Sequence, residues 1–284
     1  MSDAPLSSAS LPAPLPDSIF LKCQPRPWIS HIVFDFDGTL SWVRHGWPEL
    51  MFETFRIHWP DAAQINTPGW LTKMESIVYG MNGKPSLLQM QRYAEEATAV
   101  DGKTRDAHKL RDHFQALLDR EIYARLHAIE SGERGRDAFV IHGARPFLEY
   151  LQSLPVTLVI LSSSIEHRVR QEAEALGLTG FFGKHIYGSG VDPRGFSKWD
   201  VYGRLMADER ISGENILSFG DGPVEIECTK RLGGLAVAVC SDEDENGSGV
   251  SHPYKLRQLL ESGADAAIPD FRDAIPLTRH LLCR

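Results

Sequence analysis

The apolar residues of this chain follow two different spacings, and the changes between them divide the chain into segments. The first run, residues 31–37, reads His-Ile-Val-Phe-Asp-Phe-Asp, is too short for a helix and ends at Gly38. This run predicts a buried strand. From about residue 42 to residue 129, apolar residues recur at helical spacing between turn sequences such as Trp-Pro-Asp and Thr-Pro-Gly. This stretch predicts an all-helical insertion.

Beyond Gly143 the pattern becomes an alternation of short apolar runs and amphipathic segments, which indicates strands alternating with helices. Strands are expected at 156–161, 185–187, 216–219, 235–239 and 266–268. Helices are expected at 145–154, 165–176, 198–206 and 224–232, and serines 162–164 can cap the second of them. We therefore predict an α/β fold, a Rossmann-like doubly wound parallel sheet whose ligand site lies at the carboxyl ends of its strands.

These patterns predict the domain boundaries. The core is expected to consist of residues 28–41 and 138–284. The helical insertion, or cap, is expected to consist of residues 42–137. Residues 1–27 are rich in Ser, Ala and Pro and lack the basic start and apolar centre of a secretion signal. We expect them to form a flexible N-terminal arm.

The composition of the chain argues against several classes of function. The 284 residues carry a net charge of −8, so no global basic field attracts nucleic acid. No apolar run approaches the length of about 18 residues that a membrane span requires. The cysteines lie far apart without zinc-finger or disulfide-framework spacing. The expected protein is cytoplasmic and binds neither nucleic acid nor membrane.

Two acidic residues, Asp35 and Asp37, stand at the end of the first predicted strand. Residues two apart on a continuing strand share one face, so the two carboxylates can converge. Carboxylates this close persist when a cation lies between them or when one retains a proton. Such a pair can supply a nucleophile and a general acid. The alternative is a strand end where both residues merely cap a turn.

Three further motifs follow predicted strands or open predicted helices. Ser162 follows an apolar strand, where a hydroxyl and free helix N–H groups bind anions, although a plain N-cap has the same sequence. Lys198 opens a helix, an unfavourable end for a cation unless a negative group is near. Asp221 and Glu225 lie in Phe-Gly-Asp-Gly-Pro-Val-Glu and offer hard oxygen ligands suited to Mg²⁺. A surface lysine and a favourable first-turn acid are the alternatives for Lys198 and Glu225.

Taken in order, these motifs resemble those of the haloacid dehalogenase superfamily, a large group of mostly Mg²⁺-dependent phosphatases. The resemblance spans about residues 29–270. It implies that Asp35 attacks phosphorus and that Asp37 protonates the leaving oxygen and then activates water. It also implies that Ser162 and Lys198 hold the phosphoryl oxygens. The implied Mg²⁺ ligands are Asp35, the backbone carbonyl of Asp37, Asp221 and Glu225, the last standing where many members have an aspartate.

The helical insertion resembles the cap that this superfamily places between its first two motifs. Such a cap closes over the site and selects the leaving group. The candidate substrate-binding residues are Thr39, Arg44, Asn82, Lys84 and Ser163. An exposed hinge at Arg44 and a plain loop at 80–85 are the alternatives. The acidic run 242–245 is expected to be a solvated loop that would repel anionic substrates if it reached the site.

The sequence therefore predicts a Mg²⁺-dependent phosphatase that acts on a small-molecule phosphate ester through an aspartyl-phosphate on Asp35. Residues 219–243 resemble a subgroup associated with sugar kinases, which favours a sugar phosphate as the substrate. A phosphomutase would use the same residues and return the phosphoryl group to a sugar hydroxyl. A phosphate-binding module without turnover would keep the fold. Neither the substrate nor the oligomeric state follows from the sequence.

Overall fold

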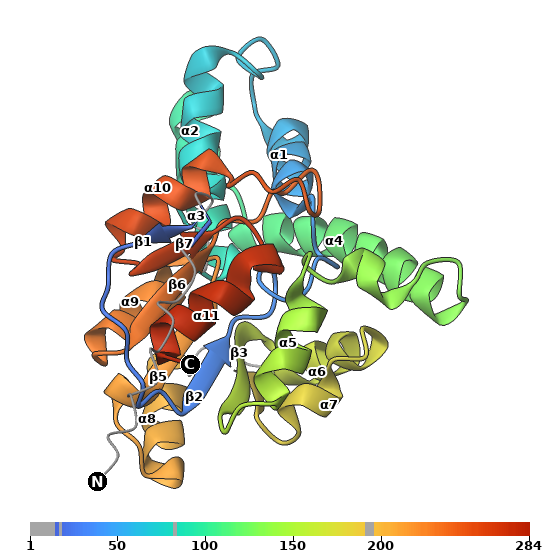
Figure 1. The fold of residues 1–284 in the computed structure, drawn as a ribbon. Coiled ribbons are helices and arrows are strands. Elements are labelled where there is room, and N and C mark those ends of the chain that lie inside the picture. The colour runs from blue at the N-terminus through green and yellow to red at the C-terminus, as the bar shows by residue number, and fades with distance from the viewer. Residues whose placement is uncertain (1–14, 17–18, 82–83, 191–195) are drawn as a thin grey trace, which may run out of the picture.

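The computed structural model describes residues 15–16, 19–81, 84–190 and 196–284 (Figure 1). A seven-stranded sheet lies at its centre, in the order β1-β7-β6-β5-β2-β3-β4. The strands are β1 (Phe20–Leu21), β2 (His31–Phe34), β3 (Thr157–Ile165), β4 (Ile186–Ser189), β5 (Ile216–Gly220), β6 (Leu235–Val239) and β7 (Ala266–Ile268). Neighbouring strands run parallel except β1 against β7. The predicted parallel core is confirmed.

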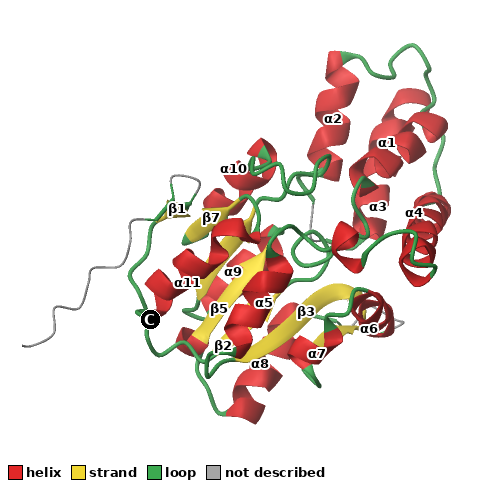
Figure 2. Ribbon diagram, turned by 45° about the vertical axis from the view of Figure 1, so that its right-hand side comes forward, coloured by secondary structure: helices red, strands yellow, loops and turns green. Residues whose placement is uncertain are grey.

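Helices lie on both faces of this sheet (Figure 2). They are α5 (Ala144–Gln152), α6 (Glu166–Ala175), α7 (Thr179–Phe182), α8 (Lys198–Glu209), α9 (Pro223–Arg231), α10 (Pro253–Glu261) and α11 (Ala274–Leu282), with 3-10 turns at Gly213–Asn215 and Phe271–Asp273. Side chains alternate along β2, so Phe34 packs against Phe147 of α5 on one face while Val33 lies in the cluster with α8 on the other. In the described residues, no helix combines the length and the apolar character needed to cross a membrane.

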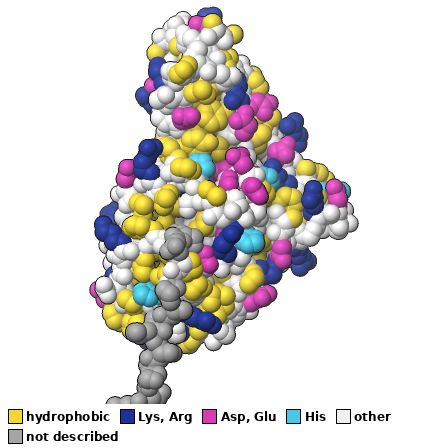
Figure 3. All heavy atoms as spheres, turned by 45° about the horizontal axis from the view of Figure 1, so that its top comes forward, with side chains coloured by type: hydrophobic (Ala, Val, Ile, Leu, Met, Phe, Trp, Pro, Cys, Tyr) yellow, Lys and Arg dark blue, Asp and Glu magenta, His cyan; other side chains and the backbone are white. Residues whose placement is uncertain are grey.

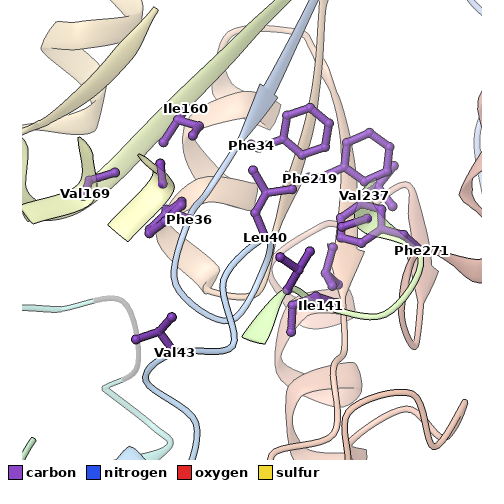
Figure 4. Close-up of a cluster of buried hydrophobic side chains, with 14 of the residues drawn as sticks. Phe34, Phe36, Leu40, Val43, Ile141, Ile160, Val169, Phe219, Val237 and Phe271 are labelled. Carbon is purple, nitrogen blue, oxygen red and sulfur yellow. The ribbon is translucent and has the colours of Figure 1, made fainter. Parts of the chain in front are cut away.

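A cluster of buried aromatic rings fixes the middle of the sheet (Figure 4). The rings of Phe34 on β2 and Phe219 on β5 are stacked, with centroids 5.2 Å apart and an interplanar angle of 11°. Phe147 of α5 and Phe271 pack against the same pair. Aromatic pairs of this kind add to the free energy gained from burial alone. The chain that leaves β2 therefore starts from a rigid frame.

The insertion between β2 and β3 is helical, as its apolar spacing predicts. It contains α1 (Trp47–His58), α2 (Pro68–Val78), α3 (Ser86–Asp101) and α4 (Ala107–Glu130), followed by a 3-10 turn at Arg136–Phe139. Its interior is aromatic, with Phe55 stacked on Tyr93 at 4.3 Å between ring centroids and Trp59 edge-on to Trp70 at 6.1 Å. The insertion rises from one end of the sheet, beside α10 (Figures 1 and 2).

Part of the expected N-terminal arm differs from the prediction. Phe20 and Leu21 form β1, the antiparallel edge strand paired with β7. The backbone N–H of Lys22 donates to the carbonyl of Asp265 at 2.7 Å, and that of Arg26 donates to the carbonyl of Leu281 at 2.6 Å. Two apolar residues in a Pro-rich stretch are too weak a pattern to reveal a strand. Residues 1–14 and 17–18 lie outside the described residues.

Candidate active site

Asp35 stands at the floor of a cavity, just beyond the carboxyl end of β2. Its backbone N–H donates to the carbonyl of Phe219 at 2.9 Å, which extends the pairing of β2 with β5 by one residue. Its Oδ1 accepts the N–H of Phe36 at 2.8 Å and lies 3.1 Å from the ammonium of Lys198. The side chain is 12% exposed. Burial raises the pKa of Asp35 well above its ordinary value, against the lowering effect of Lys198.

Lys198 is the first residue of α8 and is almost fully buried. Its ammonium forms ion pairs with Asp35 and with Glu225, the latter on α9. Burial alone would lower the pKa of Lys198, but these two carboxylates outweigh it and hold the pKa above its ordinary value. The negative group expected beside this lysine is therefore present. The ion pairs join α8 and α9 to the residue that follows β2.

Asp37 is held directly by side chains from two segments. The hydroxyl of Ser164 donates to its Oδ2 at 2.8 Å, and the guanidinium of Arg44 lies 2.9 Å from its Oδ1. Arg44 also contacts Glu172 on α6 at 2.6 Å. Burial alone would lower the pKa of Arg44, but Asp37 and Glu172 hold it above its ordinary value. Arg44 is thus a partly buried link at the base of the insertion and not an exposed hinge.

The serines after β3's apolar run are placed differently from the prediction. Residues 162–164 continue β3, and α6 begins at Glu166 without a side-chain cap. The chain stays extended because Ile165 still pairs with Ser189 of β4, after a shift of register. The predicted serine cap is therefore wrong. Ser162 is buried and its oxygen accepts the N–H of Ser164 at 3.1 Å, while Ser163 is exposed, and both border the cavity.

Asp221 follows β5 and is 8% exposed. Thr39 was predicted to bind substrate, but it is fully buried away from the cavity lining, and its hydroxyl donates to Oδ1 of Asp221 at 3.4 Å. Gly38 passes so close that a Cβ there would lie 2.2 Å from Oδ2 of Asp221, and its φ of 72° favours glycine. Burial raises the pKa of Asp221 to about 6, against the lowering effect of Lys255.

Lys255 is the main site residue that the sequence analysis missed. It lies in the first turn of α10 and is 4% exposed. Its ammonium is 3.2 Å from Oδ2 of Asp221 and 2.5 Å from Oε1 of Glu243, and it donates to the hydroxyl of Ser241 at 3.2 Å. A cation in the first turn of a helix is the same unfavourable placement that singled out Lys198. That signal could have identified Lys255.

The acidic run 242–245 belongs to the site through Glu243. The side chain of Glu243 is 12% exposed and borders the cavity, so the prediction of a wholly solvated loop is wrong at this residue. Asn246 fastens the loop, because its side chain accepts the N–H of His142 at 2.9 Å and donates to the carbonyl of Val140 at 2.8 Å. In the space-filling view, acidic side chains gather between the insertion and the core (Figure 3).

These residues form the floor of a cavity of about 680 Å³ that lies between the core and the insertion. Side chains of α1, α3 and α4 form the opposite wall. Lys84, predicted to bind substrate, is exposed and borders the cavity. Asn82, the other prediction in this loop, lies outside the described residues.

The donor set at the floor fits a hard divalent cation. Five carboxylates face three cationic side chains, which leaves an excess of two negative charges when all are ionised; the residues are Asp35, Asp37, Asp221, Glu225 and Glu243 against Arg44, Lys198 and Lys255. Oε2 of Glu225 is buried and has no hydrogen-bond partner in the described residues. Carboxylate oxygens are the ligands that Mg²⁺ prefers. Across the described ranges, no three carboxylate, histidine or cysteine side chains are already arranged around a common point as metal ligands, so the backbone carbonyl of Asp37 or water would have to complete the set.

Comparison with known proteins identifies the family. Residues 29–233 match the model of the haloacid dehalogenase-like hydrolases. The chain belongs to this family. The match includes the motif residues Asp35, Asp37, Ser162, Lys198, Asp221 and Glu225, and it ends before Glu243 and Lys255.

Solved structures support the same fold for this haloacid dehalogenase-like hydrolase. A predicted phosphoglycolate phosphatase from Haemophilus somnus is 16% identical with a TM-score of 0.59, covering 88% of this chain and 98% of its own. A hydrolase from Deinococcus radiodurans, solved with phosphate and sodium, is 15% identical with a TM-score of 0.58, covering 90% and 97%. A predicted phosphatase from Clostridium acetobutylicum is 19% identical with a TM-score of 0.56, covering 90% and 99%. A comparison of the sequence with curated proteins finds no match.

Proposed function

We propose that this hydrolase is a phosphatase that cleaves small phosphomonoesters through a phosphoryl group carried by Asp35. The observation that carries the proposal is the position of Asp35. Its largely buried carboxylate is held at the cavity floor by Lys198 and the N–H of Phe36. Both of these contacts involve Oδ1. Oδ2 is then the oxygen available for attack, and a fixed nucleophile lowers the entropic part of the barrier.

The neighbouring residues supply the remaining parts of the reaction. As the Asp35–phosphorus bond forms, the bond from phosphorus to the alcohol oxygen breaks, and Asp37 gives that oxygen a proton. Asp37 then takes a proton from water as the water oxygen attacks phosphorus, which releases phosphate and restores Asp35. Ser164 and Arg44 hold Asp37 for both transfers. Ser162, Ser163 and Lys198 are the proposed ligands of the phosphoryl oxygens.

Mg²⁺ is the proposed cofactor, because the floor carries excess negative charge and an unpartnered oxygen of Glu225. Asp35, Asp221, Glu225 and the backbone carbonyl of Asp37 would hold it. When bound, the ion neutralises charge on the phosphoryl oxygens. The phosphate and sodium found with the Deinococcus hydrolase are consistent with an anion and cation site in this fold.

The substrate is proposed to be a small-molecule phosphate ester, and the sugar phosphate expected from the sequence belongs to that class. Phosphatases are among the structural neighbours, at identities that show the fold alone. The cysteines in the described residues are free, which is consistent with the cytoplasmic location that we also propose.

Phosphate release from a panel of phosphomonoesters tests the function, with Mg²⁺ or with a chelator. We expect release that needs Mg²⁺ in the wild type and a loss of at least about 1000-fold in Asp35→Asn. Asp208→Asn, an exposed carboxamide change on α8, is the matched control and should leave release unchanged. Transfer of the phosphoryl group between positions of a sugar, without free phosphate, would identify a phosphomutase instead.

A further inference from the structure

We propose that the alcohol part of the substrate is bulky and largely apolar, with a planar ring, and is not a hydroxyl-rich sugar. This inference rests on the proposed phosphatase function and concerns the wall of the cavity that faces Asp35. The wall belongs to the insertion, outside the motifs that perform the chemistry.

The wall facing the carboxylates is formed mainly by apolar side chains. They come from three helices of the insertion, and they are Trp47 and Met51 of α1, Leu87 and Leu88 of α3, and Phe114 and Leu118 of α4. Ile165, at the end of β3, adds an apolar side chain from the core. A binding wall of this composition gains free energy by removing apolar ligand surface from water.

Three of the polar side chains that border the cavity already have partners. Gln89 donates to the backbone carbonyls of Ile77 and Val78 at 3.2 and 3.0 Å. Gln115 donates to Oδ1 of Asp119 at 2.7 Å, and Arg168 contacts the same oxygen at 2.8 Å. These contacts hold the helices of the insertion together and hold α4 against α6.

Of the other polar residues, the neighbouring charged pair and Lys84 are exposed to solvent. Arg111 contacts its neighbour Asp112 at 2.5 Å. Lys84 lies at the exposed edge and Ser86 is half-buried. A sugar would bring several hydroxyl groups against the apolar side chains of α1, α3 and α4, and hydroxyls left without partners there reduce affinity strongly. The described wall therefore favours an apolar alcohol.

The size of the cavity agrees with this reading. A volume of about 680 Å³ lies within the range that encloses ligands of drug size. The aromatic side chains of Trp47 and Phe114 both border it, and aromatic surfaces favour planar partners. A ring system joined to a phosphoryl group at the floor would use both the apolar wall and the charged floor.

The test compares benzyl phosphate with glucose 6-phosphate and glycerol 3-phosphate. All three release a primary alcohol, so the leaving groups are closely matched and differences in kcat/KM report on the wall. We expect benzyl phosphate to have a kcat/KM at least about tenfold higher than either of the others. Equal values, or a preference for glucose 6-phosphate, would overturn the inference and leave the phosphatase function intact.

A binding measurement separates this inference from the proposed function. Benzylphosphonate and 2-hydroxyethylphosphonate cannot be hydrolysed as esters, and calorimetry gives their affinities directly. Benzylphosphonate should bind at least about tenfold more tightly. Failure to release phosphate from any ester would remove the proposed function, and the ratio of these two affinities would still decide whether the wall prefers an apolar group.

A pair of variants on one helix locates the effect. Leu88 borders the cavity and is 43% exposed, whereas Val100 on the same helix is 37% exposed and lies outside the cavity lining. Leu88→Ser should lower kcat/KM for benzyl phosphate by about fivefold and that for glycerol 3-phosphate by clearly less. Val100→Ser should change neither. An equal loss with both substrates in Leu88→Ser would contradict the proposal.

Discussion

The ammonium of Lys255 lies 3.2 Å from Oδ2 of Asp221, and both side chains are almost fully buried. The contact joins the first turn of α10 to the loop after β5. Glu243 meets the same ammonium at 2.5 Å, so one lysine holds two carboxylates from different segments. This arrangement extends the active site beyond the motifs that first suggested it, to the part of the chain after β6.

Replacing Lys255 with methionine should therefore destabilise the protein. The change leaves the carboxylates of Asp221 and Glu243 buried without their cation, which costs about 3 kcal/mol in the free energy of unfolding. Urea denaturation measures this. Lys230→Met is the control, because the ion pair of Lys230 with Asp265 is partly exposed and its loss should cost less. Equal effects of the two changes would contradict the role given to Lys255.

Arg44 should matter for turnover because its guanidinium contacts Asp37 and Glu172 at once. In Arg44→Lys, the ammonium group cannot contact both carboxylates as the planar guanidinium does. Asp37 would therefore lose its fixed orientation. We expect kcat to fall at least about tenfold, with a smaller change in KM. Steady-state phosphate release measures both. Arg92→Lys, which alters exposed ion pairs on α3, should leave kcat unchanged. An unaltered kcat in Arg44→Lys would refute this assignment.

The sequence predicts the parallel core and the helical insertion, because each has a local pattern of apolar residues. The first-turn position of Lys255 is a local signal that went unused, whereas the contact of Glu243 with Lys255 joins distant segments and has no local pattern. The serine cap was wrong for a related reason. Whether residues 162–164 open a helix or continue a strand depends on the neighbouring strand β4, which holds Ile165 extended. The strand β1 likewise depends on pairing with β7, a segment far away in the sequence.

Stability should depend on pH through His31. This residue is 5% exposed, its Nε2 has no hydrogen-bond partner in the described residues, and burial lowers its pKa below the ordinary value. The neutral ring is therefore favoured in the folded state. The stability that His31 contributes is present above the ordinary histidine pKa and is lost as the pH falls towards the lowered pKa.

Denaturation of the wild type and of His31→Gln between about pH 7.5 and about pH 5.5 measures this contribution. The free energy of unfolding should fall more steeply with decreasing pH in the wild type than in the variant. Half-buried histidines such as His45, His185 and His252, whose pKa burial also lowers, contribute to both proteins, so only the difference between the two slopes is informative. Identical slopes would show that His31 titrates alike in the folded and unfolded chains.

The central claim is that Asp35 carries the phosphoryl group, and p-nitrophenyl phosphate tests it in the Asp37→Asn variant. The nitrophenolate leaves without a proton from Asp37, so the first step should proceed, while the second lacks the group that activates water. We expect a burst of about one nitrophenol per protein and, after acid quench, a phosphoryl group located on Asp35 by mass spectrometry. Release of nitrophenol without phosphorylated Asp35, or a phosphoryl group on another residue, would contradict the account.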